Sequence, residues 1–256
     1  MTLRASRHLW NRCVAKTMND VAPQISLAAT TSTDYIYNAA MELVSTSSGG
    51  PHYFISNALV AEGINFTTAC APHCDVEIIR KDDNEFGRLR GEVMPRTILF
   101  EKISAPYVII SSVYNEIKFD TAAEYAGKII LDVQGFVRMR GEFGAKKNWN
   151  GPNYLREKLW VVKANEIELK FLDADFIEEQ KKRILIITHG SAGCELFFHG
   201  EKFELVPLKK INSPHTVGAG DTLLGYFCAH LIQNNNPLSA LQYAMARTTE
   251  FLEQII

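Results

Sequence analysis

The sequence predicts an α/β protein with a doubly wound, mostly parallel sheet, helices on both faces of that sheet, and a small β-sheet lid. Three observations predict this fold class. Several short runs are apolar almost throughout instead of alternating, as is typical of strands that are buried on both faces. Helix-ending signals stand between the runs, and polar residues follow them directly. The runs are Ile25–Ala29, Tyr107–Ile110, Ile129–Leu131, Leu159–Val162 and Ile184–Ile187.

Helices are predicted between and after these runs. Asn57–Glu62 precedes Gly63, and Ala122–Ala126 precedes Gly127. Glycine commonly follows the last residue of a helix because it adopts positive φ without strain. Towards the C-terminus, apolar residues recur at helical spacing over 224–231 and 238–252, and Asn236-Pro237 is a good N-cap and first residue for the second of these helices.

Two segments, residues 35–48 and 75–103, do not fit the alternation of strands and helices. Asp75–Ile79 alternates polar and apolar residues, as a half-exposed strand does, and the charged stretch Lys81–Arg90 follows it. We expect these segments to form the lid, a small sheet lying off the main body. Body and lid form one predicted domain, residues 25–256.

Residues 1–24 form a predicted N-terminal extension with a composition of its own. Four basic residues precede the first acid, Asp20, and apolar residues recur at helical spacing. We favour a plain extension or surface helix. A mitochondrial transit peptide has the same basic, acid-poor, amphipathic character and is the alternative.

The composition of the chain argues against several classes of protein. Its 256 residues carry 27 Lys and Arg against 29 Asp and Glu, with no basic stripe, so no nucleic acid partner is expected. No apolar run approaches the roughly 18–20 residues that span a bilayer, so no membrane partner is expected either. The five scattered cysteines are interpreted as free thiols, which predicts a cytoplasmic location.

Polar residues follow the apolar runs at the point where each predicted strand ends. In an open parallel sheet, ligands bind beyond the carboxyl ends of the strands. The sequence therefore places hydroxyl, carboxylate and amide groups along one edge of the sheet, at Ser111, Ser112, Asp132, Asn165 and Thr188.

The segment His215–Thr222 carries the clearest chemical signal. Gly218, Ala219 and Gly220 stand at the start of a predicted helix, where unpaired N–H groups and the helix dipole favour a phosphate. Asp221 would repel a phosphate unless it accepts a proton from an attacking hydroxyl. An ordinary glycine turn with a first-turn acid is the alternative. P-loop, dinucleotide-binding, zinc-peptidase and α/β-hydrolase motifs are absent from the sequence.

Val217–Thr222 resembles the C-terminal signature of the ribokinase-like (PfkB) carbohydrate kinases. Four further matches occur in the order of that family: an early substrate Asp, a Gly-Gly…Asn sugar element, an Asn-x-x-Glu motif and a Thr-x-Gly-x-x-Gly nucleotide motif. They stand at Asp34, Gly49-Gly50 with Asn57, Asn165–Glu168 and Thr188–Gly193. Phe54–Asn57, Asp132–Arg138 and Thr188–Cys194 look most like the myo-inositol kinase and archaeal sugar kinase branch.

The resemblance implies a ribokinase-like fold, ATP as phosphoryl donor, Mg²⁺ as cofactor, and a sugar or polyol as acceptor, with myo-inositol one candidate. It implies that Asp221 is the catalytic base and that the amides of Gly218, Ala219 and Gly220 stabilise the transferring phosphoryl group. Thr188, Gly190 and Gly193 would line the nucleotide. Asp34, Gly49, Gly50 and Asn57 would hold the acceptor.

The roles of three other residues have alternatives. Asn165 and Glu168 would organise Mg²⁺ through water, but Asn-x-x-Glu is also a helix capping box. Arg138 meets a phosphate or the acceptor, or is simply solvated. A nucleoside kinase and a catalytically idle binding protein on the same fold are the alternative functions, whereas a nicotinamide or hydrolytic enzyme has only the fold pattern in its favour.

The sequence also departs from the family pattern. His215 stands where the family usually has an Asp that helps a monovalent-cation site, which puts potassium activation in doubt. The lid is short, so the acceptor pocket is either open or completed by a second subunit in a homodimer formed through the lid.

Overall fold

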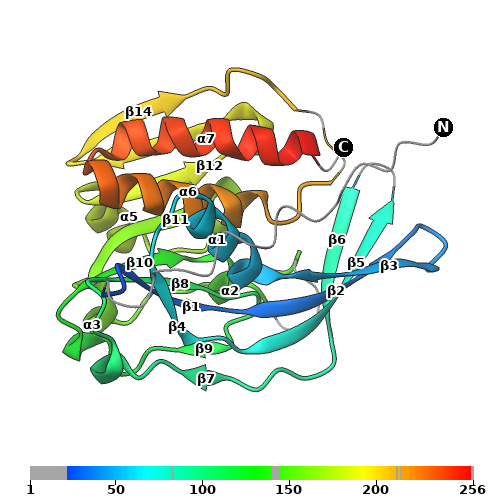
Figure 1. Cartoon of the computed structure of the whole chain (residues 1–256), viewed down its shortest axis with the longest axis horizontal. Coiled ribbons are helices and arrows are strands. Elements are labelled where there is room, and N and C mark those ends of the chain that lie inside the picture. Colours follow the sequence, from blue (N-terminus) through cyan, green and yellow to red (C-terminus); the bar gives the residue numbers. More distant parts are fainter. Residues whose placement is uncertain (1–21, 82–83, 140–143, 212, 214, 255–256) are drawn as a thin grey trace, which may run out of the picture.

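The computed structural model describes residues 22–81, 84–139, 144–211, 213 and 215–254. At its centre lies an eight-stranded sheet in the order β14-β13-β12-β11-β10-β8-β1-β4 (Figure 1). The strands from β12 to β4 are all parallel, and β13 and β14 continue the sheet antiparallel. The strands are β1 (Ile25–Ala29), β4 (Phe66–Cys70), β8 (Tyr107–Ser111), β10 (Lys128–Asp132), β11 (Leu159–Asn165), β12 (Ile184–Thr188), β13 (Cys194–Phe198) and β14 (Glu201–Leu205). The predicted mostly parallel sheet is confirmed.

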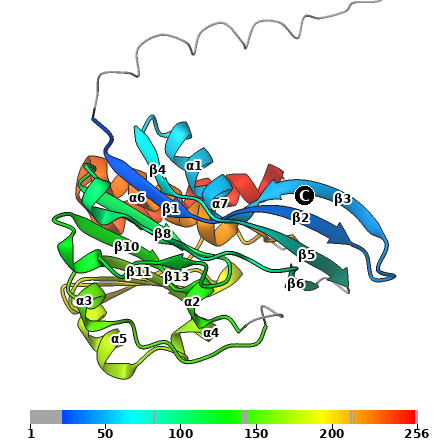
Figure 2. The ribbon, with the colours of Figure 1, turned by 90° about the horizontal axis from the view of Figure 1, so that it is seen from below.

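Helices cover both faces of this sheet (Figure 2). One face carries α1 (Gly50–Ala61), α6 (Ala219–Asn234) and α7 (Pro237–Gln254). The other carries four short helices and two 3₁₀ turns: α2 (Gln134–Val137), α3 (Asn153–Arg156), α4 (Glu166–Leu169), α5 (Ala174–Lys181), η1 (Phe100–Lys102) and η2 (Ala122–Glu124). A further 3₁₀ turn, η3 (Gly190–Ala192), follows β12.

The two helical layers explain why the strand segments are apolar throughout. Successive side chains of a strand point to opposite faces. On β10, Ile130 enters the core beneath α6 and α7, while Ile129 and Leu131 enter the core on the other face. A strand buried on both sides therefore has no polar face, as the sequence predicts for a parallel sheet.

The predicted helix at Ala122–Ala126 is only the 3₁₀ turn η2. Tyr125 has extended backbone (φ −73°, ψ 123°), and its hydroxyl donates to the carbonyl of Ala105 at 2.6 Å. Burial of the ring against Phe100 ends the helix earlier than the sequence suggests, because tertiary packing outweighs local propensity.

A second sheet of four strands, in the order β3-β2-β5-β6, projects from the body as the lid (Figure 2). Its strands are β2 (Thr31–Tyr37), β3 (Leu43–Gly49), β5 (His73–Lys81) and β6 (Asn84–Arg90). The predicted small sheet is thus present, and its strands begin before residues 35 and 75. Residues 96–103 lie elsewhere: β7 (Arg96–Thr97) pairs with β9 (Ile117–Lys118), and η1 packs into the core.

Two other points of the sequence analysis concern membrane-spanning helices and the N-terminal extension. Within the described part of the chain, every helix is too short or too polar to cross a bilayer. The N-terminal extension lies outside the described residues, except for 22–24, which lead into β1.

Candidate active site

The carboxyl ends of the parallel strands bring the predicted polar residues together. Asp132 ends β10, Asn165 ends β11 and Thr188 ends β12, and Asn165 and Thr188 are register partners. Because the strands are parallel, their carboxyl ends share one edge of the sheet. The lid lies over the same edge, since β1 continues through Thr30 into the lid strand β2.

Asp221 is buried in this edge, on the first turn of α6, with 8% of its surface exposed. Gln134 donates to its Oδ1 through Nε2 at 3.1 Å, and the hydroxyl of Ser111 lies 3.4 Å from the same oxygen. Burial, followed by the charge of Asp132, raises the pKa of Asp221 to about 7, against the opposing effects of Lys163 and Arg138. A carboxylate with such a pKa can accept a proton near neutral pH.

A buried ion pair lies beneath Asp221. Lys163 Nζ is 2.7 Å from Asp132 Oδ2, and the side chains are 6% and 0% exposed. Burial acts to lower the pKa of Lys163, but the charges of Asp132, Asp221 and Glu168 outweigh it, so the pKa is raised. Lys163 therefore stays charged and supplies positive charge next to the start of α6.

The start of α6 presents half-buried backbone groups. Gly218 is the N-cap and has φ +82°, a conformation that favours glycine. Ala219 N–H donates to Thr216 O at 3.0 Å, so this amide is engaged within the turn. Among the described residues, none accepts a hydrogen bond from the amides of Gly218 or Gly220. A side chain at position 220 would place its Cβ 3.1 Å from Lys163 Nζ, so glycine keeps the lysine and the helix start in contact.

One cavity, of about 490 Å³, lies between the lid and the sheet edge. We call it the lid cavity. Asp34 and Gly50 line it, together with Arg138 and Asp221. Asp34 is 4% exposed and accepts a hydrogen bond from the hydroxyl of Ser32. Burial raises the pKa of Asp34 in spite of that bond. The wall is not wholly polar, since Phe54, Val76 and Ile78 also line it.

Gly49 and Asn57 are the two predicted acceptor residues that do not line the lid cavity. Gly49 lies behind Asp34: a Cβ there would meet Asp34 Oδ2 at 2.0 Å, so the missing side chain makes room for the carboxylate. Asn57 lies on an exposed part of α1, about two turns beyond Gly50. The helix meets the cavity at its N-terminal end, where Gly50, Pro51 and Phe54 lie, and has left it by Asn57.

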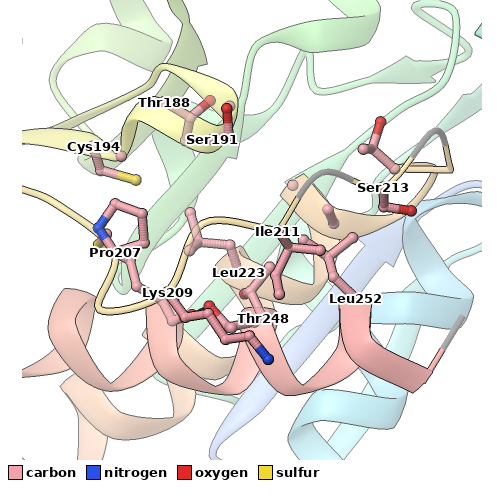
Figure 3. A pocket seen from close by; sticks show the side chains of 17 residues that line it. Thr188, Ser191, Cys194, Pro207, Lys209, Ile211, Ser213, Leu223, Thr248 and Leu252 are labelled. Atoms are coloured by element: carbon pink, nitrogen blue, oxygen red, sulfur yellow. Dashed lines mark hydrogen bonds between the residues drawn. The ribbon is translucent and has the colours of Figure 1, made fainter. Parts of the chain in front are cut away.

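A second cavity, of about 570 Å³, lies on the other side of the α6 start, between β12, α6 and α7 (Figure 3). We call it the helix cavity. Thr188, Gly190 and Gly193, the predicted nucleotide residues, line one side. Much of the remaining wall is apolar, and polar side chains, among them Lys209, Thr248 and Thr249, also contribute to it. The apolar residues are Pro207, Ile211, Leu223, Met245 and Leu252. The two cavities meet at the start of α6, since both are lined by Thr188, Gly190, Thr216, Ala219 and Gly220. We call the turn Gly218–Gly220, at this point, the cradle.

Asn165 and Glu168 form the capping box that was one of their two interpretations. Asn165 Oδ1 accepts from the amides of Ile167 and Glu168 at 2.9 and 2.8 Å, and Glu168 Oε2 accepts from Asn165 N at 2.9 Å. Both side chains also line the lid cavity, so the cap places them at the site. Burial and the charge of Asp132 raise the pKa of Glu168, with Lys163 opposing.

These residues fit a divalent cation held mainly through water. Among the described residues, no group of three or more His, Cys, Asp and Glu side chains has the geometry of a metal site. Mg²⁺ keeps several waters and needs only one or two protein carboxylates. Asp132, Glu168 and Asp221 are buried near one another, and the charge of Asp132 raises the pKa of the other two. A cation beside Glu168 would relieve this repulsion.

Arg138 is half-buried, and its guanidinium is hydrogen-bonded within the protein. It donates through NH1 to Val113 O at 3.0 Å and through NH2 to Gln134 Oε1 at 3.3 Å. Gln134 in turn donates to Asp221. Arg138 therefore orients the amide that orients the carboxylate, and it lines the lid cavity itself.

Three residues of the site were not among the candidates predicted from the sequence: Lys163, Gln134 and Glu85. Lys163 had a visible signal, since it is the one charged residue in the otherwise apolar strand segment 159–164. Gln134 stands within a segment quoted for the family resemblance but was given no role. Glu85 lies in the charged stretch of the lid, where the sequence does not distinguish it from its neighbours.

Comparisons with known proteins agree with this architecture. Residues 147–248 match the family described as pfkB family carbohydrate kinase. No curated protein has a sequence that matches the chain. The resemblance predicted from the motifs is confirmed, because the C-terminal part matches this family and the chain has the fold of ribokinase-family kinases.

Three solved structures illustrate the shared fold. A pyrophosphate-dependent kinase of the ribokinase family, complexed with a pyrophosphate analogue and myo-inositol, has a TM-score of 0.67 at 17% identity, with 90% of this chain and 95% of that chain covered. Ribokinase of Arabidopsis thaliana, complexed with ribose and ATP, has a TM-score of 0.60 at 15% identity, with coverages of 91% and 93%. The nucleoside kinase of Methanocaldococcus jannaschii has a TM-score of 0.61 at 14% identity, with coverages of 90% and 98%.

Proposed function

We propose that this protein is a kinase that transfers the γ-phosphoryl group of ATP to a hydroxyl of a sugar or polyol. The observation that carries the proposal is the position of Asp221: a buried carboxylate with a raised pKa at a helix start that lies between two cavities. A phosphoryl donor in the helix cavity and a hydroxyl acceptor in the lid cavity would meet at this point.

In this mechanism the acceptor hydroxyl faces Asp221, which takes its proton as the oxygen attacks phosphorus. Gln134 and Ser111 hold Asp221 Oδ1 and so direct the carboxylate. The amides of Gly218 and Gly220, with the Lys163 ammonium nearby, stabilise negative charge on the transferring group. The engaged amide of Ala219 shapes the turn instead of donating to the phosphoryl group.

Mg²⁺ supplies charge neutralisation on the donor phosphates when it is bound. Glu168, and Asn165 beside it, would hold the ion through water at the edge of the lid cavity. Thr188, Gly190 and Gly193 would contact the donor at the opposite edge. The structure supports no separate proposal for a monovalent cation, since His215 faces Glu85 at 3.4 Å where an Asp is usual in the family.

A nucleotide suits the helix cavity better than a bare pyrophosphate. Its walls are largely apolar beyond Gly193, and an aromatic base can bury its faces against such walls. A pyrophosphate donor would leave these walls without a contact. We therefore assign ATP as donor, although one similar structure is of a pyrophosphate-dependent kinase.

A polyol suits the lid cavity because carboxylate and amide groups face hydroxyls well. Asp34 is the principal acceptor-binding residue in this proposal, with Gly50 giving close approach to the backbone. Myo-inositol and other sugars are the first acceptors to test. A nucleoside, whose base would lie against Phe54, Val76 and Ile78, is the second.

The test is ADP formation by the purified chain with Mg-ATP and a panel of sugars, inositols and nucleosides, with pyrophosphate as a second donor. Turnover with one acceptor, lost in Asp221→Asn, supports the proposal. Tight nucleotide or sugar binding in calorimetry without any turnover would identify a catalytically idle binding protein instead.

We also propose that two copies associate through the lid. Strand β3 lies at the edge of the lid sheet, where Leu43 and Val44 are 53% and 63% exposed, and Met41 in the preceding turn is 48% exposed. An edge strand with apolar residues readily pairs with a second copy. Light scattering of the intact chain and of Leu43→Glu tests this, since the variant should be monomeric.

The proposed location is the cytoplasm. The four cysteines in the described part of the chain, Cys70, Cys74, Cys194 and Cys228, are free thiols, as is usual in a reducing compartment. Fractionation of cells that express the full chain tests the location, and recovery from mitochondria would favour the transit-peptide interpretation of residues 1–24.

A further inference from the structure

One carboxylate of the lid reaches the segment that precedes α6. Glu85, on β6, accepts a hydrogen bond from the backbone N–H of Thr216 through Oε2, at 2.9 Å. The side chain of Glu85 is 11% exposed, so solvent competes little for this bond. The two residues are 131 positions apart in the chain: Glu85 lies in the lid sheet, and Thr216 lies in the segment between β14 and α6.

The other oxygen of the same carboxylate is also held. Arg80 Nε, on β5, donates to Glu85 Oε1 at 3.0 Å, and His215 Nδ1 lies 3.4 Å from Oε1. Contacts on both oxygens fix the plane of the carboxylate, which directs Oε2 at the Thr216 amide.

Thr216 passes this restraint directly to the cradle. Its N–H donates to the lid, and its carbonyl accepts from Ala219 N at 3.0 Å, at the first residue of α6. The next residue, Val217, packs against the apolar cluster of Cys74, Val76, Ile78 and Val113, three of which belong to the lid. The position of Gly218 is thus tied to the position of the lid on this side.

On its other side, Gly218 rests against α1. A Cβ at Gly218 would lie 2.3 Å from the ring of Phe54, so the turn is held between Phe54 and the lid. Movement of the lid away from the body would break the Glu85 bond and release one side of this clamp.

We propose that Glu85 is a positioning residue that couples closure of the lid over the acceptor to the placement of the Gly218 and Gly220 amides. This inference rests on the proposed function, since it gives those amides to the transferring phosphoryl group. With the lid over the body as it is here, the Glu85–Thr216 bond holds the cradle in the geometry that phosphoryl transfer needs, and an acceptor that holds the lid in this position favours the same geometry.

The test compares three variants. Glu85→Ala removes the acceptor of the Thr216 bond. Glu85→Gln keeps a carbonyl oxygen for that bond but loses the charge facing Arg80 and His215. Glu77→Ala is the matched control, because Glu77 is a lid carboxylate on β5 that is paired with Arg88 across the same sheet.

We expect Glu85→Ala to lower kcat by about 10- to 100-fold, because small displacements of positioned groups are costly in rate, with KM of the donor changed much less. Glu85→Gln should recover most of kcat, and Glu77→Ala should match the unaltered chain. Hydrogen exchange should show faster exchange of the Thr216–Gly220 amides in Glu85→Ala alone, with unchanged protection of β8 and β10 as evidence of folding.

Three outcomes overturn the proposal. If Glu85→Ala has the same kcat as Glu77→Ala, the contact between lid and Thr216 does not determine the position of the cradle. If Glu85→Gln lowers kcat as much as Glu85→Ala does, the charge of Glu85, and not its hydrogen bond with Thr216, is responsible for the effect. Unchanged exchange at 216–220 in Glu85→Ala means that the segment is held by other contacts. If the unaltered chain turns over no acceptor, the proposed function fails, and the exchange measurement still decides whether Glu85 restrains the cradle.

Discussion

The lid cavity and the helix cavity meet at the start of α6, yet they differ in how many charged side chains line them. The lining of the lid cavity includes the buried residues Asp34, Asp221, Glu168 and Lys163 and the half-buried Arg138. The helix cavity has Lys209 as its charged lining residue, with aliphatic side chains such as Leu223 and Leu252 and with hydroxyls both near β12 and on α7, where Thr248 lies (Figure 3). In the proposed function, the charged groups that would hold and deprotonate a hydroxyl are separate from the apolar surface that would hold a base. On the proposed function, the acceptor would be bound mainly by charged and polar groups of the lid cavity, and the base of the donor mainly by apolar groups of the helix cavity.

The largest effect on activity is expected for substitution of Asp221, the proposed base in the lid cavity. Asp221→Asn keeps the shape but cannot accept a proton, so kcat should fall by about 10²–10⁴-fold, as for loss of a general base. Steady-state kinetics with the best acceptor measures this. Ser111→Ala, which removes only a weak contact to Asp221, is the control and should retain far more activity; a mild effect of Asp221→Asn would contradict the assignment.

Substitutions of Asp34 and Asn57 test whether the lid cavity binds the acceptor. Asp34→Ala should raise KM of the acceptor by about 10²-fold, since a buried charge-assisted contact is lost, and leave KM of the donor nearly unchanged. Asn57→Ala should leave both KM values unchanged because Asn57 is outside the cavity. An acceptor KM that responds to Asn57 and not to Asp34 would exclude this site geometry.

Filling the helix cavity with a larger side chain tests whether this cavity binds the base of ATP. Thr249 lines it from α7, and Thr249→Phe should occupy the space of a base and raise KM for ATP by about tenfold, the effect of a lost apolar contact of ordinary size. The acceptor KM is the internal control. If pyrophosphate serves as donor and its KM is equally affected, the cavity does not discriminate between donors by burial of a base.

The smallest expected effect is on pH dependence. Because the pKa of Asp221 is raised to about 7 by burial, kcat/KM should rise with pH and level off above neutrality. The same raised pKa has the opposite effect on stability, since the free energy of unfolding should fall as the pH rises. A raised pKa in the folded state means that ionisation costs stability, a cost absent below the unfolded value near 4 and complete above about 7.

Asp221→Asn removes that cost, so the melting temperature of the variant relative to the unaltered chain should increase as the pH is raised from about 4 to about 8. Thermal unfolding over this range measures it. A pH-independent difference would show that the carboxylate is not destabilised by burial.

Much of the architecture was predictable because it depends on local rules. Apolar runs predicted the parallel strands, and polar residues at the strand ends predicted the edge that carries Asp132, Asn165 and Thr188. The start of α6 was predictable from Gly218–Gly220, since close backbone approach requires small residues. The engagement of the Ala219 amide with Thr216 was not, because a hydrogen bond within a turn depends on the backbone angles of the folded loop.

The remaining features depend on contacts between distant segments. Lys163 and Asp132 are register partners on neighbouring strands, a relation fixed by sheet pairing and not by sequence spacing. Glu85 acquires its role only when the lid is folded over the body. Asn57 shows the converse: its motif match placed it among the acceptor residues, but the direction of α1 takes it away from the cavity, and a motif does not encode that direction.

The crossing of α6 and α1 extends these effects beyond the cavities. Gly225 lies on α6 where the helix crosses α1, and a Cβ there would come within 2.7 Å of Ala58 Cβ and 3.0 Å of Ile55 O. One added methyl group would force the two helices apart and tilt the N-terminal end of α6 that presents Asp221. Random mutagenesis should therefore recover inactive but folded variants at this helix crossing, among residues that never touch either substrate.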